Sequence, residues 1–237
     1  MTDEPPRKRM VRRPTGGTDA GRASAKRLKT AKERTPSSQA WLERQLNDPF
    51  VAEAQAKGYR SRAAFKLSEI DQKFRLIGRG ARVVDLGCAP GGWVQIALER
   101  GAGAVVGVDL LSLDPLHPAT IIQADFTDPA VGPRLIELLG GAPDLILSDM
   151  APNTTGHAAT DHIRIMALLE AAYPFACEVL KPGGIFVAKV FQGGTERELL
   201  AQMKKDFDDV RHAKPKASRS DSSEIYVVAS GFKRAKN

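Results

Sequence analysis

Short apolar segments recur along most of the chain and alternate with longer amphipathic ones. The apolar segments lie at 81–86, 104–108, 120–124, 144–147, 185–190, 210–213 and 225–229. Continuous apolar runs are typical of buried parallel strands, and helices cover both faces of such a sheet. The pattern therefore predicts a Rossmann-like α/β fold: a seven-stranded, mostly parallel sheet with helices on both faces.

The amphipathic segments predict helices over 61–77, 92–100, 161–180 and 195–207, and a short helix over 41–46. In the first of them apolar residues recur at spacings of four and three, which places them on one helical face. These residues are Ala63, Leu67, Ile70, Phe74 and Ile77. Gly78 and Gly80 are expected to end that helix. Thr195 and Glu198 form a capping box that is expected to begin the last one.

The basic residues are concentrated at the N-terminus. Residues 1–40 contain 11 lysines and arginines against four acids, so they carry the whole net charge of +7. Residues 1–38 have almost no large apolar side chains, and such a composition cannot bury enough surface to fold. We therefore predict a basic disordered arm over 1–38 and one domain over 39–237. The arm is suited either to binding a phosphate backbone or to keeping the protein in solution.

Nothing in the sequence predicts secretion, a membrane span or a metal site. No apolar run approaches the roughly 18 residues that span a bilayer, and the N-terminus lacks the apolar segment of a signal peptide. Cys88 and Cys177 form no disulfide framework, and neither they nor the four histidines have metal-ligand spacing. We expect a cytoplasmic protein that binds no metal and no membrane.

A glycine-rich turn, Asp85–Trp93, joins the first apolar run to the helix that follows it. Glycines at 87, 91 and 92 let the backbone approach a nucleotide-like ligand at the carboxyl end of a strand. The spacing differs from the GxGxxG motif of dinucleotide sites, and Pro90 lacks the N–H that a pyrophosphate would need. A dinucleotide-dependent oxidoreductase is disfavoured but stays open.

Four successive apolar runs end in acids, which are Asp85, Asp109, Asp125 and Asp149. Asp109 is placed to accept hydrogen bonds from ribose hydroxyls, and Asp125 to accept one from an adenine amino group. Trp93, at the start of a helix, lies either in the core or beside the ligand. These acids suit nucleotide sites and S-adenosylmethionine sites alike.

Five segments together resemble the FtsJ/RlmE family of RNA ribose 2′-O-methyltransferases, and the resemblance extends from about Trp41 to Gly231. The segments are Gly58–Leu67, Asp85–Trp93, Ser148–Asn153, Ala188–Gly193 and Ser218–Tyr226. The resemblance implies an S-adenosylmethionine-dependent methyltransferase fold. It also implies 2′-O-methylation of a uridine ribose in the 23S RNA of the large ribosomal subunit, late in assembly. The long basic arm departs from the compact pattern of the family.

The resemblance also assigns roles to particular residues. It implies cofactor contacts at Gly91, Trp93, Asp109, Asp125 and Asp149. It implies a catalytic tetrad of Lys66, Asp149, Lys189 and Glu224. All these residue types are present at the matching positions.

The tetrad suits the chemistry because a ribose hydroxyl is a weak nucleophile. In-line transfer from a sulfonium needs alignment of the reacting atoms, and the acceptor needs either a base or a positive charge. Lys189 is the candidate for that role, as a base or as a cation, with Lys66 as a second cation. Asp149 is expected to hold Lys189, and Glu224 to orient Lys66 or the ribose.

Ribosomal RNA is the expected partner, and we expect a monomer. Six basic residues are candidates for phosphate contacts beside the acceptor: Arg60, Arg62, Arg211, Lys214, Lys216 and Arg219. Tyr59 and Phe191 are candidates either for stacking on a base or for core packing. Methylation of transfer RNA or of an mRNA cap ribose, and a non-enzymatic role in ribosome assembly, stay open as alternatives.

Overall fold

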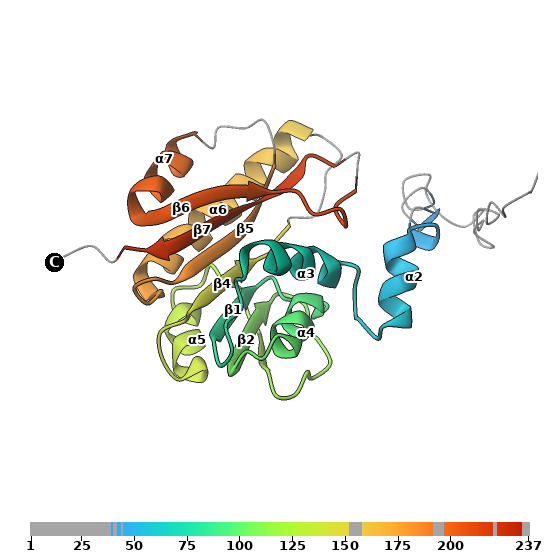
Figure 1. Ribbon diagram of the computed structural model, residues 1–237, viewed down its shortest axis with the longest axis horizontal. Helices are drawn as coiled ribbons and strands as arrows, with labels where there is room; N and C mark the ends of the chain where they lie inside the picture. The colour runs from blue at the N-terminus through green and yellow to red at the C-terminus, as the bar shows by residue number, and fades with distance from the viewer. Residues whose placement is uncertain are drawn as a thin grey trace, which may run out of the picture. The chain divides into compact units, whose positions relative to one another are not determined.

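The computed structural model (Figure 1) describes residues 39, 42–43, 45–151, 158–191, 197–219 and 222–233. The chain divides into two compact units, Met1–Asn47 and Asp48–Asn237. The predicted arm over 1–38 lies outside the described residues, as do Trp41 of the short N-terminal helix and Thr195 of the predicted capping box.

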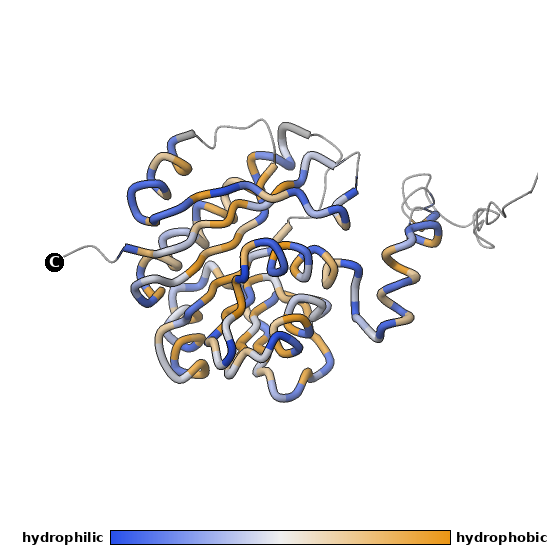
Figure 2. Tube along the Cα trace, viewed as in Figure 1, coloured by the Kyte–Doolittle hydropathy of each residue, from blue (hydrophilic) through white to orange (hydrophobic). Residues whose placement is uncertain are grey.

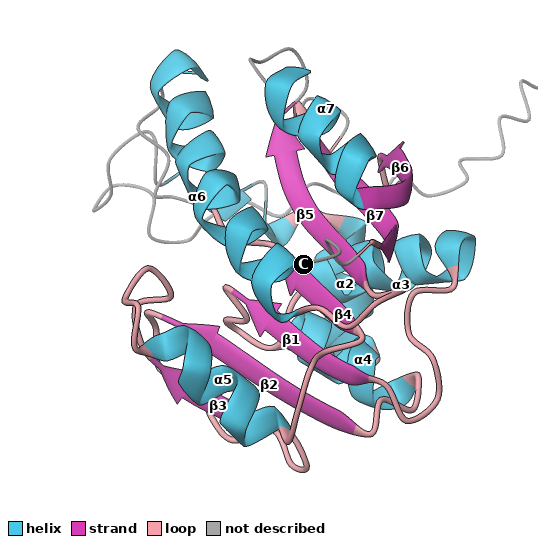
Figure 3. Cartoon of the chain, turned by 90° about the vertical axis from the view of Figure 1, so that its left-hand side faces the viewer, coloured by secondary structure: helices cyan, strands magenta, loops and turns pink. Residues whose placement is uncertain are grey.

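A seven-stranded sheet forms the centre of the second unit (Figure 3). Its strands are β1 (Arg82–Leu86), β2 (Ala104–Asp109), β3 (Thr120–Gln123), β4 (Leu145–Ser148), β5 (Ile185–Phe191), β6 (Phe207–Ala213) and β7 (Glu224–Phe232). They lie in the order β3-β2-β1-β4-β5-β7-β6. Only β7 runs antiparallel to its neighbours β5 and β6. The predicted fold class is confirmed.

Helices cover both faces of the sheet. The described helices of this unit are α2 (Pro49–Ala56), α3 (Ala63–Phe74), α4 (Gly92–Glu99), α5 (Val131–Leu139), α6 (Ala158–Val179) and α7 (Arg197–Asp206). The apolar sides of α3 and α4 share one buried cluster, and those of α5, α6 and α7 share another. Figure 2 shows hydrophobic residues concentrated along the central strands.

Alternation along each strand divides its side chains between these two clusters. In β1, Val84 and Leu86 pack with α5 and α6, while Val83 packs with α3 and α4. Both sets are buried, because successive side chains of a strand point to opposite faces and both faces are covered. Because both faces are buried, the strands could be recognised in the sequence as continuous apolar runs.

Several predicted boundaries were wrong. The helix predicted to reach Ile77 ends at Phe74, because Arg75 adopts a left-handed conformation with φ 55°. The backbone N–H of Ile77 donates to the Asp71 side chain instead of continuing the helix (2.9 Å). Asp85 lies within β1 rather than at its end, and helices α2 and α5 were not predicted at all. Among the described residues, no helix is long and apolar enough to span a bilayer.

Candidate active site

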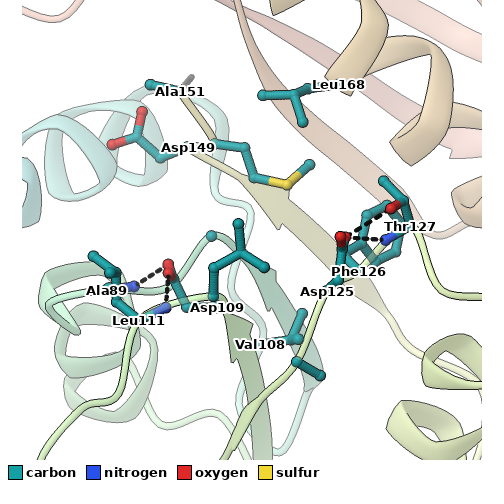
Figure 4. Close-up of a pocket in the computed structure, with 14 residues that line it drawn as sticks. Ala89, Val108, Asp109, Leu111, Asp125, Phe126, Thr127, Asp149, Ala151 and Leu168 are labelled. Carbon is teal, nitrogen blue, oxygen red and sulfur yellow. Dashed lines mark hydrogen bonds between the residues drawn. The ribbon is translucent and has the colours of Figure 1, made fainter. Parts of the chain in front are cut away.

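A pocket of about 450 Å³ lies at the edge where the parallel strands end (Figure 4). We call it the strand-end pocket. Asp109 ends β2, Asp125 follows β3 and Asp149 follows β4, and all three line it. The predicted convergence of these three acids is therefore observed, and it arises because the carboxyl ends of parallel strands share one edge of the sheet.

Asp109 is held by the turn after β1 and by the loop after its own strand, and Asp125 by the loop after β3. Oδ2 of Asp109 accepts from the backbone N–H of Ala89 (2.8 Å), and Oδ1 accepts from that of Leu111 (2.9 Å; Figure 4). Oδ1 of Asp125 accepts from the hydroxyl and the N–H of Thr127, and these bonds lower the pKa of the Asp125 carboxyl. A carboxylate has about four acceptor sites, so both acids retain capacity for a ligand.

The remaining wall of the strand-end pocket is largely apolar. Leu110 and Leu111 are 65% and 66% exposed, although large apolar side chains are usually covered. Together with Val108, Phe126 and Leu168 they border the pocket. An apolar cleft with a few fixed polar groups is typical of a small-molecule site, and its volume is in the ordinary range for one.

Asp85 lies beneath this edge as a buried acid without a partner. It is 1% exposed, and neither carboxylate oxygen has a hydrogen-bond partner in the part of the chain that the structure describes. Burial raises the pKa of Asp85 well above its ordinary value, and the charges of Asp149 and Asp109 raise it further. This concentration of carboxylates favours a ligand that carries positive charge.

The predicted tetrad forms two ion pairs. Nζ of Lys189 lies 2.8 Å from Oδ1 of Asp149 and also donates to the carbonyl oxygen of Asp149 (2.8 Å). Nζ of Lys66, on α3, lies 2.7 Å from Oε1 of Glu224, at the start of β7. The four side chains are only 7% to 16% exposed. A buried charge without a partner is costly, so each lysine stays close to its carboxylate.

Tyr226 connects the two pairs, and no sequence pattern indicated this role. Its hydroxyl lies 2.8 Å from Oδ1 of Asp149 and 3.2 Å from Oε1 of Glu224. Lys189 and Tyr226 are directly opposite in the β5–β7 ladder, so their side chains lie on the same face of the sheet. The antiparallel pairing, which the apolar pattern does not reveal, brings Tyr226 to the tetrad.

The pKa values of Asp149 and Tyr226 are shifted in opposite directions, although burial acts on both in the same direction. Burial by itself raises the pKa of Asp149, but the charges of Lys189 and Lys66 and the hydrogen bonds from Lys189 and Tyr226 lower it below its ordinary value. Burial and the nearby charges of Asp149 and Glu224 raise the pKa of Tyr226 well above its ordinary value. Asp149 is therefore a charged acceptor, and Tyr226 remains a protonated donor.

Comparison with known proteins identifies the family. Residues 59–232 match the family described as FtsJ-like methyltransferase. The chain belongs to the FtsJ-like methyltransferase family.

Relatives and solved structures agree with this assignment. A protein named ribosomal RNA large subunit methyltransferase E from Caulobacter sp. (strain K31) is 66% identical over 94% of this chain and 99% of its own length. A protein of the same name from Granulibacter bethesdensis is 64% identical over 87% of this chain and 90% of its own. A crystal structure described as a ribosomal RNA methyltransferase from Plasmodium falciparum aligns with a TM-score of 0.66 and 32% identity. That alignment covers 73% of this chain and 98% of the other.

Two further residues with predicted cofactor contacts, Gly91 and Trp93, do not line the strand-end pocket of this methyltransferase. Trp93 is 3% exposed; its Nε1 donates to the carbonyl oxygen of Ala63 (2.8 Å), and its ring lies 5.6 Å from that of Tyr226. Gly91 has a φ of 109°, and a Cβ there would come within 2.5 Å of the Leu116 side chain. Neither borders the pocket, and Trp93 supports the phenol of Tyr226 from within the core.

Several of the candidate phosphate contacts are engaged within the protein. The Arg60 guanidinium donates to the carbonyl oxygens of Asp114 (2.7 Å) and Pro115 (3.0 Å), in the loop after β2. Arg62 pairs with Asp48, and Arg219 lies 3.7 Å from the same carboxylate. Arg60 thus holds a loop whose first residues border the strand-end pocket.

The other candidates occupy varied environments. Arg211 pairs with Asp209 (2.6 Å), and Nζ of Lys214 donates to the carbonyl oxygen of Ser222 (2.9 Å). Lys216 is exposed. The Tyr59 hydroxyl donates to Glu99 (2.9 Å), and Phe191 is half-buried.

Proposed function

We propose that this protein methylates the 2′-hydroxyl of a uridine ribose in the 23S RNA of the large ribosomal subunit, with S-adenosyl-L-methionine as methyl donor. The observation that carries the proposal is the joining of Lys66–Glu224 and Lys189–Asp149 through Tyr226, beside a pocket that Asp149 also lines. The names of the relatives supply the substrate class.

The residues of the strand-end pocket fit the proposed donor. Asp109 retains acceptor capacity for ribose hydroxyls, and Asp125 for an adenine amino group, while Leu110 and Leu111 offer apolar surface to the base. The unpartnered Asp85 and the carboxylates near it suit a cationic donor. Gly91 and Trp93 are proposed to act on the donor indirectly, by shaping the turn after β1. When bound, the sulfonium supplies an activated methyl group, so the proposed reaction uses no metal ion.

Lys189 is proposed to act on the acceptor oxygen. An ammonium carries three N–H donors, and two of those on Lys189 are used by Asp149. The third is available to the 2′ oxygen, where it would orient a lone pair toward the methyl group. As the methyl–oxygen bond forms, the methyl–sulfur bond breaks and the hydroxyl proton passes to solvent, and the ammonium would stabilise the negative charge that this proton loss leaves on the oxygen. Asp149 would hold Lys189 in that position at the border between the donor and acceptor sites.

Lys66 and Glu224 are proposed to position the ribose. Oε1 of Glu224 accepts from the hydroxyl of buried Ser218 (2.9 Å) as well as from Lys66. Nζ of Lys66 lies 5.8 Å from the centre of the Tyr226 ring, which adds a second contact to the cation. These contacts limit both side chains to one arrangement, as alignment of a weak nucleophile requires.

RNA is proposed to reach the site over Lys214, Lys216 and Arg219, with the arm over 1–38 adding sequence-independent contacts to phosphates. We further propose that the protein acts as a monomer in the cytoplasm, where it modifies the subunit late in assembly.

Mass mapping of ribose methylation tests the proposed function. 23S RNA from cells that lack this protein is expected to lose one 2′-O-methyluridine, which the purified protein restores with S-adenosylmethionine. Free 23S RNA and isolated large subunits serve as parallel substrates. An unchanged set of ribosomal 2′-O-methyl groups overturns the substrate assignment, and a loss confined to transfer RNA supports the alternative substrate.

A further inference from the structure

A second, larger groove lies at the opposite edge of the sheet from the strand-end pocket. Its volume is about 910 Å³, roughly twice that of the pocket. It is bordered by the first residues of β1, β2 and β5 and by the residue that precedes β4. The tails of the arrows of the parallel strands in Figure 3 mark this edge. We call it the basic groove.

Four basic residues line the basic groove. Arg75 follows α3, Arg79 lies in the turn before β1, Arg82 begins β1, and Lys181 follows α6. All four are exposed. The single acid of the lining, Asp144, pairs with Lys181 and also accepts from the backbone N–H of Arg82 (2.8 Å).

Among the described residues the three guanidinium groups lack an ion-pair partner, although the charge of Arg82 acts on Asp144 at longer range and helps to lower the pKa of that carboxyl. Within the part of the chain that the structure describes, Arg75, Arg79 and Arg82 form no ion pair and their side chains donate no hydrogen bond. The contrast with Arg60, Arg62 and Arg100, which are held by carbonyl or carboxyl oxygens, is clear. Arginines that stabilise the fold are engaged, and these three are available to a ligand.

Overall composition does not account for this concentration of charge. Residues 41–237 contain as many acids as lysines and arginines, so the charge of the folded chain sums to zero. The basic groove, with three unpaired arginines and one paired lysine, is therefore a local concentration of positive charge. Guanidinium groups bind phosphate oxygens through paired, directed hydrogen bonds, and an extended polyanion satisfies several of them at once.

We propose that the basic groove binds the phosphate backbone of a second RNA segment, remote from the nucleotide that is methylated. This inference rests on the proposed function, since that function supplies a large folded RNA as substrate. The five residues of β1 separate the two edges by about 15 Å at roughly 3.3 Å per residue. The nucleotide in the active site therefore cannot itself reach the basic groove, whereas another segment of a folded ribosomal RNA can.

The test compares two triple variants of the full-length protein. The groove variant carries Arg75→Gln, Arg79→Gln and Arg82→Gln. The matched control carries Arg134→Gln, Lys204→Gln and Lys205→Gln, which removes the same charge from exposed positions outside the groove. Thermal unfolding checks both. The single variant Arg79→Gln, in a turn, serves if the triple groove variant fails to fold.

Binding to protein-free 23S RNA is measured as a function of salt concentration. Three lost phosphate contacts reduce the slope of log affinity against log salt by about 2 to 3, and the single variant reduces it by about 0.7 to 0.9. The groove variant is also expected to show a KM for 23S RNA raised about tenfold or more, with unchanged kcat and unchanged affinity for S-adenosylmethionine. Hydroxyl-radical footprinting should show lost protection at one RNA segment and retained protection around the methylated nucleotide.

Equal slopes, KM values and footprints for the groove and control variants overturn the inference. A defect seen with assembled subunits but absent with protein-free RNA also overturns it, because the groove would then contact a ribosomal protein. Failure of the proposed function would give a different result. The wild-type protein would then bind RNA without methylating it, and the salt slopes of the groove and control variants would still show whether the groove binds RNA.

Discussion

Lys189 and Asp149 are joined twice, through the carboxylate oxygen and through the carbonyl oxygen of the same aspartate, both at 2.8 Å from the lysine Nζ. Asp149 also lines the strand-end pocket, so one residue connects the proposed donor site with the proposed acceptor cation. The double contact determines where the third N–H of Lys189 is directed, and this geometry leads to the first prediction.

Lys189→Ala is expected to leave the affinity for S-adenosylmethionine within about twofold and to reduce methyl transfer by at least roughly 100-fold. The physical reason is the loss of the cation that stabilises the developing charge. Calorimetry measures cofactor affinity, and incorporation of labelled methyl groups measures transfer. Lys205→Ala, at an exposed position on α7, is the control. Robust turnover by Lys189→Ala would remove Lys189 from the mechanism.

Tyr226→Phe is expected to lower kcat about tenfold, with little change in cofactor affinity. The variant retains the ring that contacts Trp93 and removes only the hydroxyl between Asp149 and Glu224, a loss on the order of 1 kcal/mol. Tyr173→Phe is a matched control, because that buried phenol donates to Asp206 and packs with the α5, α6 and α7 cluster instead. Single-turnover rates make the comparison, and equal rates for the two variants would contradict a role for the Tyr226 hydroxyl.

Asp109→Asn is expected to weaken S-adenosylmethionine binding about 10- to 100-fold. The variant loses a charged acceptor for the ribose hydroxyls, and a hydrogen bond to a charged group contributes roughly 1.5–3 kcal/mol. The amide oxygen of the variant still accepts from one of the two backbone N–H groups that hold Asp109. At saturating cofactor, kcat should remain close to that of the wild-type protein. Asp114→Asn, with an exposed side chain in the same loop, is the control. Unchanged affinity by calorimetry would exclude Asp109 from donor binding.

Asp85→Asn is expected to stabilise the cofactor-free protein at neutral pH by roughly 1–3 kcal/mol, because the amide occupies the same buried site without an ionisable group. The pKa of Asp85 is raised in the folded state, so its stabilising contribution is complete below the ordinary value near 3.8 and is lost as pH rises through the folded value. The variant has no carboxyl at this position, so its stability does not fall in this way as pH rises. Its advantage should therefore grow from about pH 4 upward, as measured by urea unfolding at several pH values. A difference that is constant with pH would contradict the buried, uncompensated carboxyl.

Deletion of residues 2–38 is expected to weaken binding to 23S RNA and to reduce its salt slope, because the arm carries the net positive charge of the chain. Cofactor affinity should not change. Filter binding at several salt concentrations makes the measurement, and an identical slope without the arm would leave it no electrostatic role in RNA binding.

Burial determined which elements could be predicted from sequence. The run 81–86 predicted β1 because a central parallel strand is apolar on both faces. Helix α5 was missed although Val131, Leu135 and Leu139 recur every four residues, because Gly132 and Pro133 resemble a helix break. Both lie in the first turn, where proline is tolerated. Helix α2 was missed although Asp48 caps it and Pro49 begins it.

The sequence by itself determined the residue types at the strand ends and the family to which they belong. The family segments carry Lys66, Asp149, Lys189 and Glu224, and the apolar runs place Asp109 and Asp125 at their ends. Side chains at the carboxyl ends of parallel strands converge wherever such a sheet forms, so the strand-end pocket followed from the pattern.

Only the tertiary structure decided which charges pair. Lys66 lies with Glu224, and Lys189 with Asp149, across separations that no local pattern spans. The antiparallel insertion of β7 between β5 and β6 sets Tyr226 opposite Lys189 and brings Glu224 to α3. Strand order and direction depend on the packing of the whole sheet against its helices. The link through Tyr226, the burial of Trp93 beneath it and the unpaired arginines of the basic groove therefore became visible only in three dimensions.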